Sequence, residues 1–443
     1  MRVNKIPVIP VYIGMTVVLV ILLFFSNNLF AKKIVSPEKA LQKSIHQQMI
    51  PALKLLKKLV NINSGTTNTK GVHKVGELLR PEFKALGFKT YWVAEPASFH
   101  RAGTLYAVRK GSIGKRILLI AHLDTVFAKN SPFQHYTRKG NIATGPGVID
   151  DKGGIIVILY ALKALNAIHA LDNTSITVAM MGDEEDSGKP ASISRKSLFA
   201  VAKKSDVALD FECSLGLDTA TIARRGVSRF MIMTKGSATH SAQIFKDGGF
   251  GANLELARIL TTAATTLAKQ KYISFNPAIM LGGAMVNYNR NSVTGTVSAK
   301  TNIIAKTAIA DGDLRFISPE QQFKVEQEIK DIVKNHLPGT NAAVIFQDGI
   351  PAMEPTENNL KLLKLYSKIS QELGYGKVVP LDPAARGAGD ISYIAYSVPA
   401  NLAGLGPLGA GGGAHSLDEG LTISSLPVVT TRAAVLIYQL LSN

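Results

Sequence analysis

Apolar residues recur along the first half of the chain in segments of two lengths. Residues 41–60 have helical spacing, and residues 154–165 form a second apolar segment of helix length. Residues 116–121, 175–181 and 207–211 are short apolar runs typical of buried strands. The alternation of such strands with helices predicts an α/β domain with a mainly parallel sheet.

The middle of the chain predicts a second unit. Its β-α-β-β-α-β order is the split ferredoxin-like pattern. The α/β pattern resumes with a helix at residues 357–373 that Gly374 caps, so the unit is predicted to be an inserted domain within the larger one. Its predicted elements are strands at 226–235, 278–286, 303–316 and 342–346 and helices at 252–270 and 320–336. The predicted division is residues 40–223 and 339–443 for the larger domain and 224–338 for the inserted domain.

The N-terminus has the layout of an export signal. Arg2 and Lys5 precede an apolar stretch at residues 11–25, and Ala31 offers a small residue for cleavage. Residues 1–31 are therefore predicted to be a signal peptide or, alternatively, an uncleaved membrane anchor. Either alternative places the remaining chain in the periplasm, outside the cell or on the membrane.

The amino-acid composition and net charge exclude several classes of protein. With 46% hydrophobic and 19% charged residues among 443, the chain is globular and not disordered or fibrous. The net charge of +18 comes from scattered Lys and Arg without interleaved aromatics, so a nucleic-acid partner is not expected and an anionic membrane surface is an alternative. Cys213 is the only cysteine, so no intramolecular disulfide can form, and Cys213 is expected to be a small core residue or to support a neighbouring site.

The acidic triplet Asp183, Glu184 and Glu185 closes the apolar run at residues 175–182. Adjacent acids at the end of a buried strand are unfavourable unless they bind a cation or move a proton. Successive side chains diverge, so Glu184 and Glu185 are expected to have different roles. Taken alone, the triplet is also typical of a solvated turn, and Asp183 has no predicted role.

Further acidic and imidazole side chains follow the other predicted strands and turns. In open α/β sheets ligands bind beyond the carboxyl ends of the strands, so these groups are expected to meet in one crevice. One histidine with several carboxylates suits zinc or manganese better than calcium. A distant glycine-rich segment at residues 411–415 supplies a second imidazole, His415. The other groups are His122 and Asp124 after residues 116–121, Asp150 and Asp151 after a turn at 145–147, and Glu212 after residues 207–211.

With these motifs the chain resembles the M20 family of co-catalytic zinc peptidases, and within it the glutamate carboxypeptidase-like branch. The resemblance runs from about residue 45 to the C-terminus and rests on residues 121–126, 145–154, 182–185 and 413–415. It implies a zinc-exopeptidase-like catalytic domain with an inserted ferredoxin-like α+β lid and dimerisation domain. It also implies two Zn²⁺ ions per subunit, with Mn²⁺ or Co²⁺ as alternatives, and a homodimer formed through the lid.

The resemblance implies a role for each matching residue. His122 and Glu212 would hold one zinc, Glu185 and His415 the other, and Asp150 would bridge them. Asp124 would orient the His122 imidazole, and Glu184 would be the general base. In the inserted domain, His240 would stabilise the oxyanion. Residues expected to contact the substrate are Asn302 and Arg315, together with Gly413 and Arg386 in the larger domain.

Departures from this branch leave the substrate open. Residues 347–352 lack the arginine expected of folate-hydrolysing glutamate carboxypeptidases, and residues 386–390 and 409–413 also differ. These differences put a preference for C-terminal glutamate in doubt, while Arg386 offers a replacement carboxylate contact. For Arg315 an ion pair at the end of its strand is the alternative. The expected activity is a carboxypeptidase on small peptides; the alternatives are an aminoacylase or amidohydrolase on N-acyl amino acids and an inactive binding protein.

Overall fold

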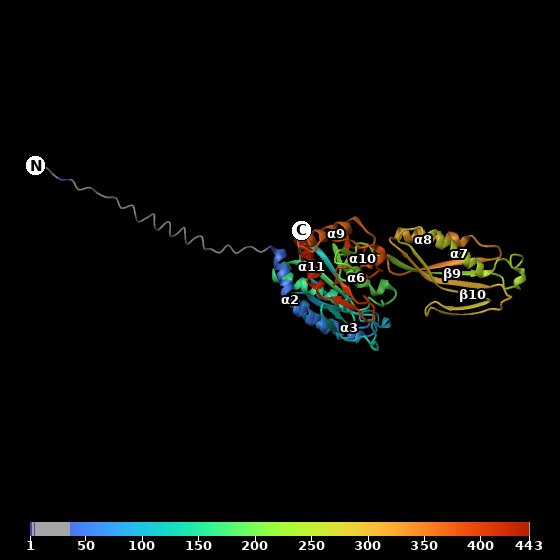
Figure 1. Ribbon diagram of the computed structural model, residues 1–443, viewed down its shortest axis with the longest axis horizontal. Helices are drawn as coiled ribbons and strands as arrows, with labels where there is room; N and C mark the ends of the chain where they lie inside the picture. The colour runs from blue at the N-terminus through green and yellow to red at the C-terminus, as the bar shows by residue number, and fades with distance from the viewer. Residues whose placement is uncertain (2–3, 5–35, 443) are drawn as a thin grey trace.

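The chain forms two domains that lie side by side along the long axis of the molecule (Figure 1). A computed structural model describes residues 1, 4 and 36–442. Apart from Met1 and Asn4, the predicted export segment at residues 1–31 lies outside the described residues. The larger domain joins the two outer parts of the sequence, and the inserted domain projects from it at the end remote from helix α2 (Pro37–Val60) (Figure 1).

A six-stranded sheet forms the centre of the larger domain and confirms the mainly parallel prediction. Its middle and one edge are parallel, whereas the first two strands pair antiparallel at the other edge. The predicted strands at 116–121, 175–181 and 207–211 all belong to its parallel part. In spatial order the strands are β1 (Lys89–Val93), β2 (Thr104–Arg109), β6 (Thr174–Met181), β3 (Ile113–His122), β7 (Val207–Asp210) and β16 (Ala400–Leu402).

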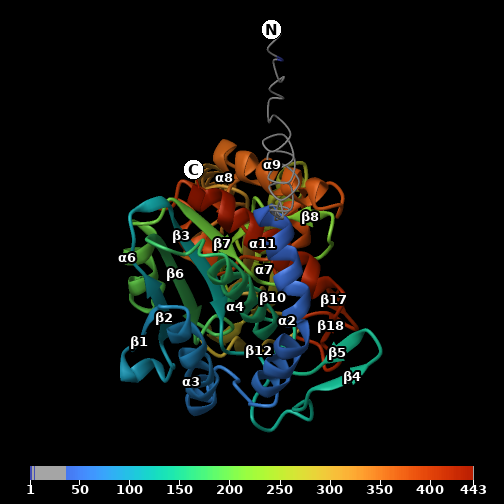
Figure 2. The same cartoon turned by 90° about the vertical axis from the view of Figure 1, so that its left-hand side faces the viewer.

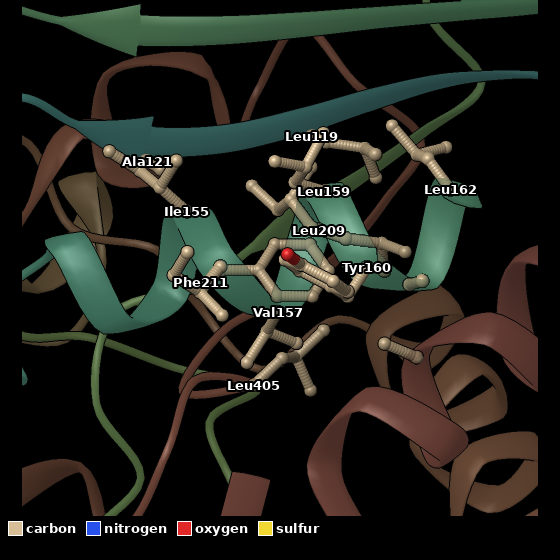
Figure 3. Packing of buried hydrophobic residues seen from close by; sticks show 14 of the residues in the cluster. Leu119, Ala121, Ile155, Val157, Leu159, Tyr160, Leu162, Leu209, Phe211 and Leu405 are labelled. Atoms are coloured by element: carbon tan, nitrogen blue, oxygen red, sulfur yellow. The ribbon is translucent and has the colours of Figure 1, made fainter. Parts of the chain in front are cut away.

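Both faces are buried at the centre of this sheet, which explains why β6, β7 and the second half of β3 are mostly apolar. Successive side chains of β3 point to opposite faces, so Leu119 and Ala121 pack under α4 (Lys152–Ala167), as Figure 3 shows. Leu118 and Ile120 face the other side. The first face is covered by α2, α3 (Thr69–Ala85), α4, α9 (Glu357–Glu372) and α11 (Ser425–Ser442), and the second by α6 (Lys196–Ala202) and α10 (Asp390–Ile394).

Helix α11 is long and apolar enough to cross a membrane, the one such helix among the described residues. However, 72% of its apolar window is buried inside the protein. Ala434, Val435 and Leu436 belong to the same core cluster as α2 and α4. We therefore interpret α11 as a core helix of the larger domain.

The inserted domain has the predicted β-α-β-β-α-β order, and its sheet order 4-1-3-2 is that of a ferredoxin-like fold. One correction concerns its end: β14 (Asn341–Asp348) pairs with β9 (Gly226–Lys235), so the inserted domain extends beyond the predicted residue 338. The predicted strand at 278–286 also divides in two, and the second piece forms a hairpin. Its other elements are α7 (Gly251–Leu267), β10 (Ser274–Gly283), β11 (Met285–Asn289), β12 (Thr294–Ser298), β13 (Thr307–Phe316) and α8 (Pro319–Lys334).

Two antiparallel segments connect the domains. Arg224 and Met353 exchange backbone hydrogen bonds of 2.8 and 2.9 Å, and the amide of Val227 donates to the carbonyl of Ile350. The remaining elements are short. They are η2 (Ala97–Phe99), β4 (Thr137–Lys139), β5 (Ile142–Thr144), α5 (Ala191–Ser194), β8 (Thr219–Ala220), η3 (Ser241–Gln243), β15 (Val379–Pro380), η4 (Pro383–Ala385), β17 (Gly409–Ala410) and β18 (Gly420–Thr422).

Candidate active site

Four segments that are distant in sequence meet at the carboxyl edge of the parallel strands, as the strand order requires. His122 is the last residue of β3, and Glu185 lies just beyond β6. Asp150 immediately precedes the turn into α4. His415 lies in the loop between β17 and β18. One ligand atom from each of His122, Asp150 and Glu185 lies within 4.8 Å of the others.

Asp150 lies between the two imidazoles. Its Oδ1 is 2.8 Å from Nε2 of His122, and its Oδ2 is 3.2 Å from Nε2 of His415. The same His415 nitrogen is 3.0 Å from Oε2 of Glu185. A carboxylate that offers one oxygen to each side is suited to bridge two cations.

The backbone of His415 is in the left-handed region, with a φ of 68°. Few non-glycine residues adopt this conformation, although His100 and His169 do so as well. Gly411 and Gly413, with φ of 67° and 81°, allow the loop to turn so that His415 reaches Asp150. No atom lies within 4 Å of the point where a Cβ on Gly413 would stand, so this part of the loop leaves open space.

Asp124 is fully buried and holds the surroundings of His122 together. Its Oδ1 lies 3.3 Å from Nδ1 of His122. Its two carboxylate oxygens also accept the backbone N–H groups of Glu184 and Glu185, at 3.0 and 3.2 Å, and Oδ2 accepts the Thr66 hydroxyl at 2.6 Å. Asp124 therefore orients the imidazole and fixes the acidic triplet against it, as a carboxylate behind a metal-bound histidine does.

Sequence reasoning missed a second supporting acid, Glu419. Its Oε1 accepts the backbone N–H groups of Ile149 and Asp150 at 3.1 and 3.3 Å, which fixes the segment that carries Asp150. Burial and the nearby charge of Asp150 raise the pKa of Glu419 to about 8. Glu419 lies in a loop with no motif around it, and only its contact with a segment 270 residues away shows its role.

Glu184 lies beside the cluster. Burial, followed by the negative charge of Glu212, raises the pKa of its carboxyl well above the usual value. A carboxyl with a raised pKa can exchange a proton near neutral pH, which a general base and acid requires. The structure thus distinguishes Glu185, which contacts His415, from Glu184, whose carboxyl pairs with no imidazole within residues 36–442.

Glu212 is held by arginines in this structure. Oε2 of Glu212 lies 2.7 Å from Nη2 of Arg224 and 3.7 Å from Nη2 of Arg386. Burial raises the pKa of the Glu212 carboxyl, but the two guanidinium groups outweigh burial and lower it. Glu212 is therefore ionised and close to the cluster, although it does not belong to the close group of His122, Asp150 and Glu185.

Arg386 is only 6% exposed, and its Nη2 donates to the carbonyl of Cys213 at 2.6 Å. Its guanidinium lies near the Glu212 carboxylate and helps to keep it ionised. This geometry argues against the predicted contact between Arg386 and a substrate carboxylate. Cys213 is buried and lies 3.3 Å from the same Arg386 nitrogen, as expected of a cysteine that supports a neighbouring site.

Asp183, which had no predicted role, forms a buried ion pair. Its Oδ1 accepts Nη1 of Arg195 at 2.7 Å, and its Oδ2 accepts the backbone N–H of Gly188. Nε of Arg195 also donates to Asp390 at 2.6 Å, at the start of α10. These contacts tie the loop that carries Glu184 to the C-terminal part of the larger domain.

The polar residues predicted in the inserted domain do not contact this cluster. His240 is exposed at the start of η3, where its Nδ1 accepts the backbone N–H of Ala242. Exposed Asn302 lies beside it, because its carbonyl accepts the N–H of Ser241. Arg315 pairs with Asp313 at 3.0 Å, which is the alternative expected for it. Nη1 of Arg315 nonetheless lies 3.9 Å from where a Cβ on Gly387 would stand, so its guanidinium reaches the larger domain.

The cluster fits divalent metal ions. In the metal-free protein burial disfavours a charged His122, but Asp124 and Asp150 outweigh burial and hold the His122 pKa well above its usual range. Hydrogen bonds to Asp150 and Glu185 raise the pKa of His415 to about 11. The carboxylates thus attract positive charge to the imidazole nitrogens. Imidazole and carboxylate are ligands that zinc prefers. In addition, Oε1 of Glu185 is buried without a hydrogen-bond partner in the part of the chain that the structure describes.

Comparison with known proteins identifies the family. The profile of peptidase family M20/M25/M40 matches residues 118–439. Carboxypeptidase G2 from Pseudomonas sp. (strain RS-16) is 30% identical over 395 residues, which cover 88% of this chain and 89% of that protein.

Solved structures share the fold at lower identity. Aminopeptidase PepT from Bacillus cereus ATCC 10987 matches with a TM-score of 0.67 at 15% identity, over 88% of this chain and 98% of its own. A dinuclear metal binding peptidase of the M20 family from Bacillus subtilis matches with a TM-score of 0.61 at 15% identity, over 90% and 99%. Because the profile and the carboxypeptidase G2 relative both span most of this chain, the protein belongs to peptidase family M20/M25/M40 and is a hydrolase of the metallopeptidase class.

Proposed function

We propose that the protein is an exported dizinc carboxypeptidase that cleaves a peptide or amide bond next to a free C-terminal carboxylate. The observation that supports this most is the position of Asp150, with one oxygen toward each imidazole and Glu184 nearby. The carboxypeptidase G2 relative supports the direction of cleavage and makes glutamate the first side chain to test.

The metal-binding residues divide into two sets. His122 and Glu212 would hold one ion, Glu185 and His415 the other, and Asp150 would be shared. Zinc bound there would lower the pKa of a coordinated water and polarise the scissile carbonyl. Glu212 would bind with Arg224 still at its side, since that ion pair keeps the carboxylate ionised.

Glu184 supplies the proton transfer. Its carboxylate would take a proton from the attacking water and deliver it to the leaving amine. The raised pKa makes the Glu184 carboxylate a stronger proton acceptor, and the proton that it takes can then pass to the leaving amine. Asp124 fixes the Glu184 backbone and therefore the position of this carboxyl.

The inserted domain would bind the substrate. Arg315 and Asn302 would grip its C-terminal carboxylate, and His240 would stabilise the tetrahedral oxyanion. The open space at Gly413 would accommodate substrate beside His415. His240 is exposed and does not contact the proposed metal ligands. Completion of the site would therefore require domain closure or a second subunit. A homodimer formed through the inserted domain would meet this need.

A panel of paired substrates tests the proposal. Zinc-loaded protein is incubated with N-blocked dipeptides ending in glutamate, alanine or lysine, with the C-terminal amide of each, and with N-acetyl amino acids. We expect free-acid dipeptides to be cleaved at least about tenfold faster than their amides, because the lost ion pair to Arg315 contributes about 1.5 kcal/mol. Equal turnover of acids and amides contradicts carboxylate recognition. Faster release of acetate from the N-acetyl amino acids supports an aminoacylase instead, and no turnover supports a binding protein.

The localisation is tested by fractionation. We propose that residues 1–31 direct export, either as a cleaved signal or as a membrane anchor. N-terminal sequencing of the purified protein distinguishes a start near residue 32 from an intact Met1. Recovery of the intact chain in the cytoplasm contradicts export.

A further inference from the structure

Helix α2 carries its positive charge on one exposed face. At 100° per residue, Lys39, Lys43, His46, Ile50, Lys54 and Lys57 fall within an arc of about 80°, and all six are exposed. We call these six residues the basic face of α2. The opposite side of the helix is buried in the core through Leu41, Ile45, Ala52, Leu56 and Leu59. The core therefore fixes which side of α2 points outward.

The lysines of the basic face are not neutralised by the protein. Glu38 is the only acidic residue in α2. Over residues 36–442, no ion pair involves any lysine of this face, whereas lysines on other helices, such as Lys163 and Lys361, pair with glutamates. A row of unpaired lysines on a rigid helix attracts an extended anionic surface.

Ile50 lies in the middle of the basic face and is 69% exposed. The apolar face of α2 is in the core, so Ile50 is the apolar side chain of the basic face that can enter the headgroup region while the lysines meet anionic lipids. Helix α2 has 24 residues, and the basic face runs along most of its length.

The position of α2 supports this interpretation. α2 lies at the end of the molecule remote from the inserted domain (Figure 1), and it runs along the outside of the larger domain (Figure 2). In the sequence, the apolar stretch at residues 11–25 ends shortly before the helix begins at Pro37. An uncleaved anchor at these residues would keep α2 close to the same bilayer.

We propose that the basic face of α2 binds the surface of an anionic phospholipid bilayer and so holds the larger domain against the membrane. In this orientation the inserted domain points away from the bilayer. Attraction of each lysine to the surface strengthens binding about fivefold at moderate salt. The proposal does not depend on the reaction that the enzyme catalyses.

Vesicle binding of the full chain tests the proposal. Co-sedimentation compares phosphatidylcholine vesicles with vesicles that also contain phosphatidylglycerol. The ratio of the two affinities removes the contribution of the apolar N-terminal stretch, which acts on both lipids. One variant combines Lys39→Gln, Lys43→Gln, Lys54→Gln and Lys57→Gln. A control variant with the same change in charge combines Lys235→Gln, Lys246→Gln, Lys269→Gln and Lys324→Gln, four exposed lysines of the inserted domain.

We expect the wild-type chain and the control variant to prefer phosphatidylglycerol vesicles by at least about tenfold, and to lose this preference at high salt. The α2 variant should bind both vesicles alike. Equal binding by the wild type, or equal loss in both variants, overturns the proposal. Tighter binding to duplex DNA than to these vesicles, lost in the α2 variant, assigns the face to nucleic acid and also overturns it.

A fluorescent probe locates the contact. An environment-sensitive dye on Ile50→Cys should shift to the blue with phosphatidylglycerol vesicles. The same dye on Val297→Cys, an exposed site of the inserted domain, should not shift. A shift at Val297→Cys without one at Ile50→Cys contradicts the proposed orientation. The native Cys213 is buried and does not compete for the dye.

Discussion

The two domains present their predicted site residues in opposite ways. In the larger domain Asp124 and Asp150 are each held by contacts from several segments. In the inserted domain His240 and Asn302 are exposed, and Arg315 has one carboxylate partner. The proposed metal-binding residues are thus held in place without substrate, while the proposed substrate-binding residues are not yet brought to them.

This difference has a physical basis. Carboxylates that converge in a buried site repel one another, so their positions must be fixed by opposite charges and hydrogen bonds. Residues that recognise a substrate carboxylate must remain accessible to it. They stay solvated until the substrate binds, so the free protein does not bear the free-energy cost of burying their charges. Changes in the larger domain should therefore affect metal binding and chemistry, and changes in the inserted domain should affect substrate affinity.

Metal removal should have the largest effect. Dialysis against a chelator should abolish turnover, because no bound ion then activates the attacking water or polarises the scissile carbonyl. The far-ultraviolet circular dichroism should change little, since the core of the larger domain does not depend on the cluster. Zinc, manganese and cobalt are then added back separately, and activity is measured with each. Full activity in protein shown to be metal-free would rule out the mechanism.

Glu184→Gln should reduce kcat by about 10²–10⁴-fold, the usual contribution of a general base. The amide has the same shape but cannot take a proton, so bound zinc should stay at the wild-type level. Steady-state kinetics and metal analysis on the same sample check both expectations. Glu357→Gln, at an exposed end of α9, is the matched control and should retain wild-type kinetics. Normal turnover by Glu184→Gln contradicts the assignment of the base.

Asp124→Asn should weaken metal binding by about 10- to 100-fold, because the His122 imidazole loses the carboxylate that orients it. Competition with a coloured chelator measures this affinity. Asp172→Asn, an exposed aspartate remote from the cluster, should bind metal like the wild type. Unchanged affinity in Asp124→Asn means that the backbone alone positions His122.

Arg315→Ala should raise KM for free-acid peptides by about tenfold, the contribution of one charged hydrogen bond. Metal content should not change, because Arg315 belongs to the inserted domain. The KM of the corresponding amides should stay the same, which separates carboxylate recognition from a general disturbance. If metal content falls as well, the proposed division of labour between the domains is wrong.

The smallest expected effect concerns Glu95, which also lies in the larger domain. Burial and the charge of Asp183 raise the pKa of Glu95 to about 8, while an unfolded glutamate has a pKa of about 4.3. Between about pH 5 and 8 the folded protein keeps a proton that the unfolded chain has released, so stability falls as the pH rises through this window. Glu95→Gln should therefore flatten the decline of Tm with pH by a few degrees. An unchanged slope shows that Glu95 is ionised in the folded protein.

The sequence predicted regular elements well where hydrophobic spacing was strong. The strand predicted at 226–235 matches β9, and the helix predicted at 357–373 matches α9 to within one residue. It did not predict α3, β1 or β2, which are short or more polar. The end of the inserted domain was predicted at residue 338, before the strand predicted at 342–346, whereas the pairing of β14 with β9 places that strand in the inserted domain.

The sequence by itself determined the α/β alternation, the insertion and the identity of the groups at the strand ends, since these follow from local spacing and from motifs. Tertiary structure alone decided their partners. It placed Glu185 against His415 and Arg386 behind Glu212, assigned Asp183 to Arg195, and revealed Glu419 behind Asp150. Such roles depend on contacts across as many as 270 residues. Local spacing carries no information on them, because it is the packing of the sheet and helices that brings those side chains together.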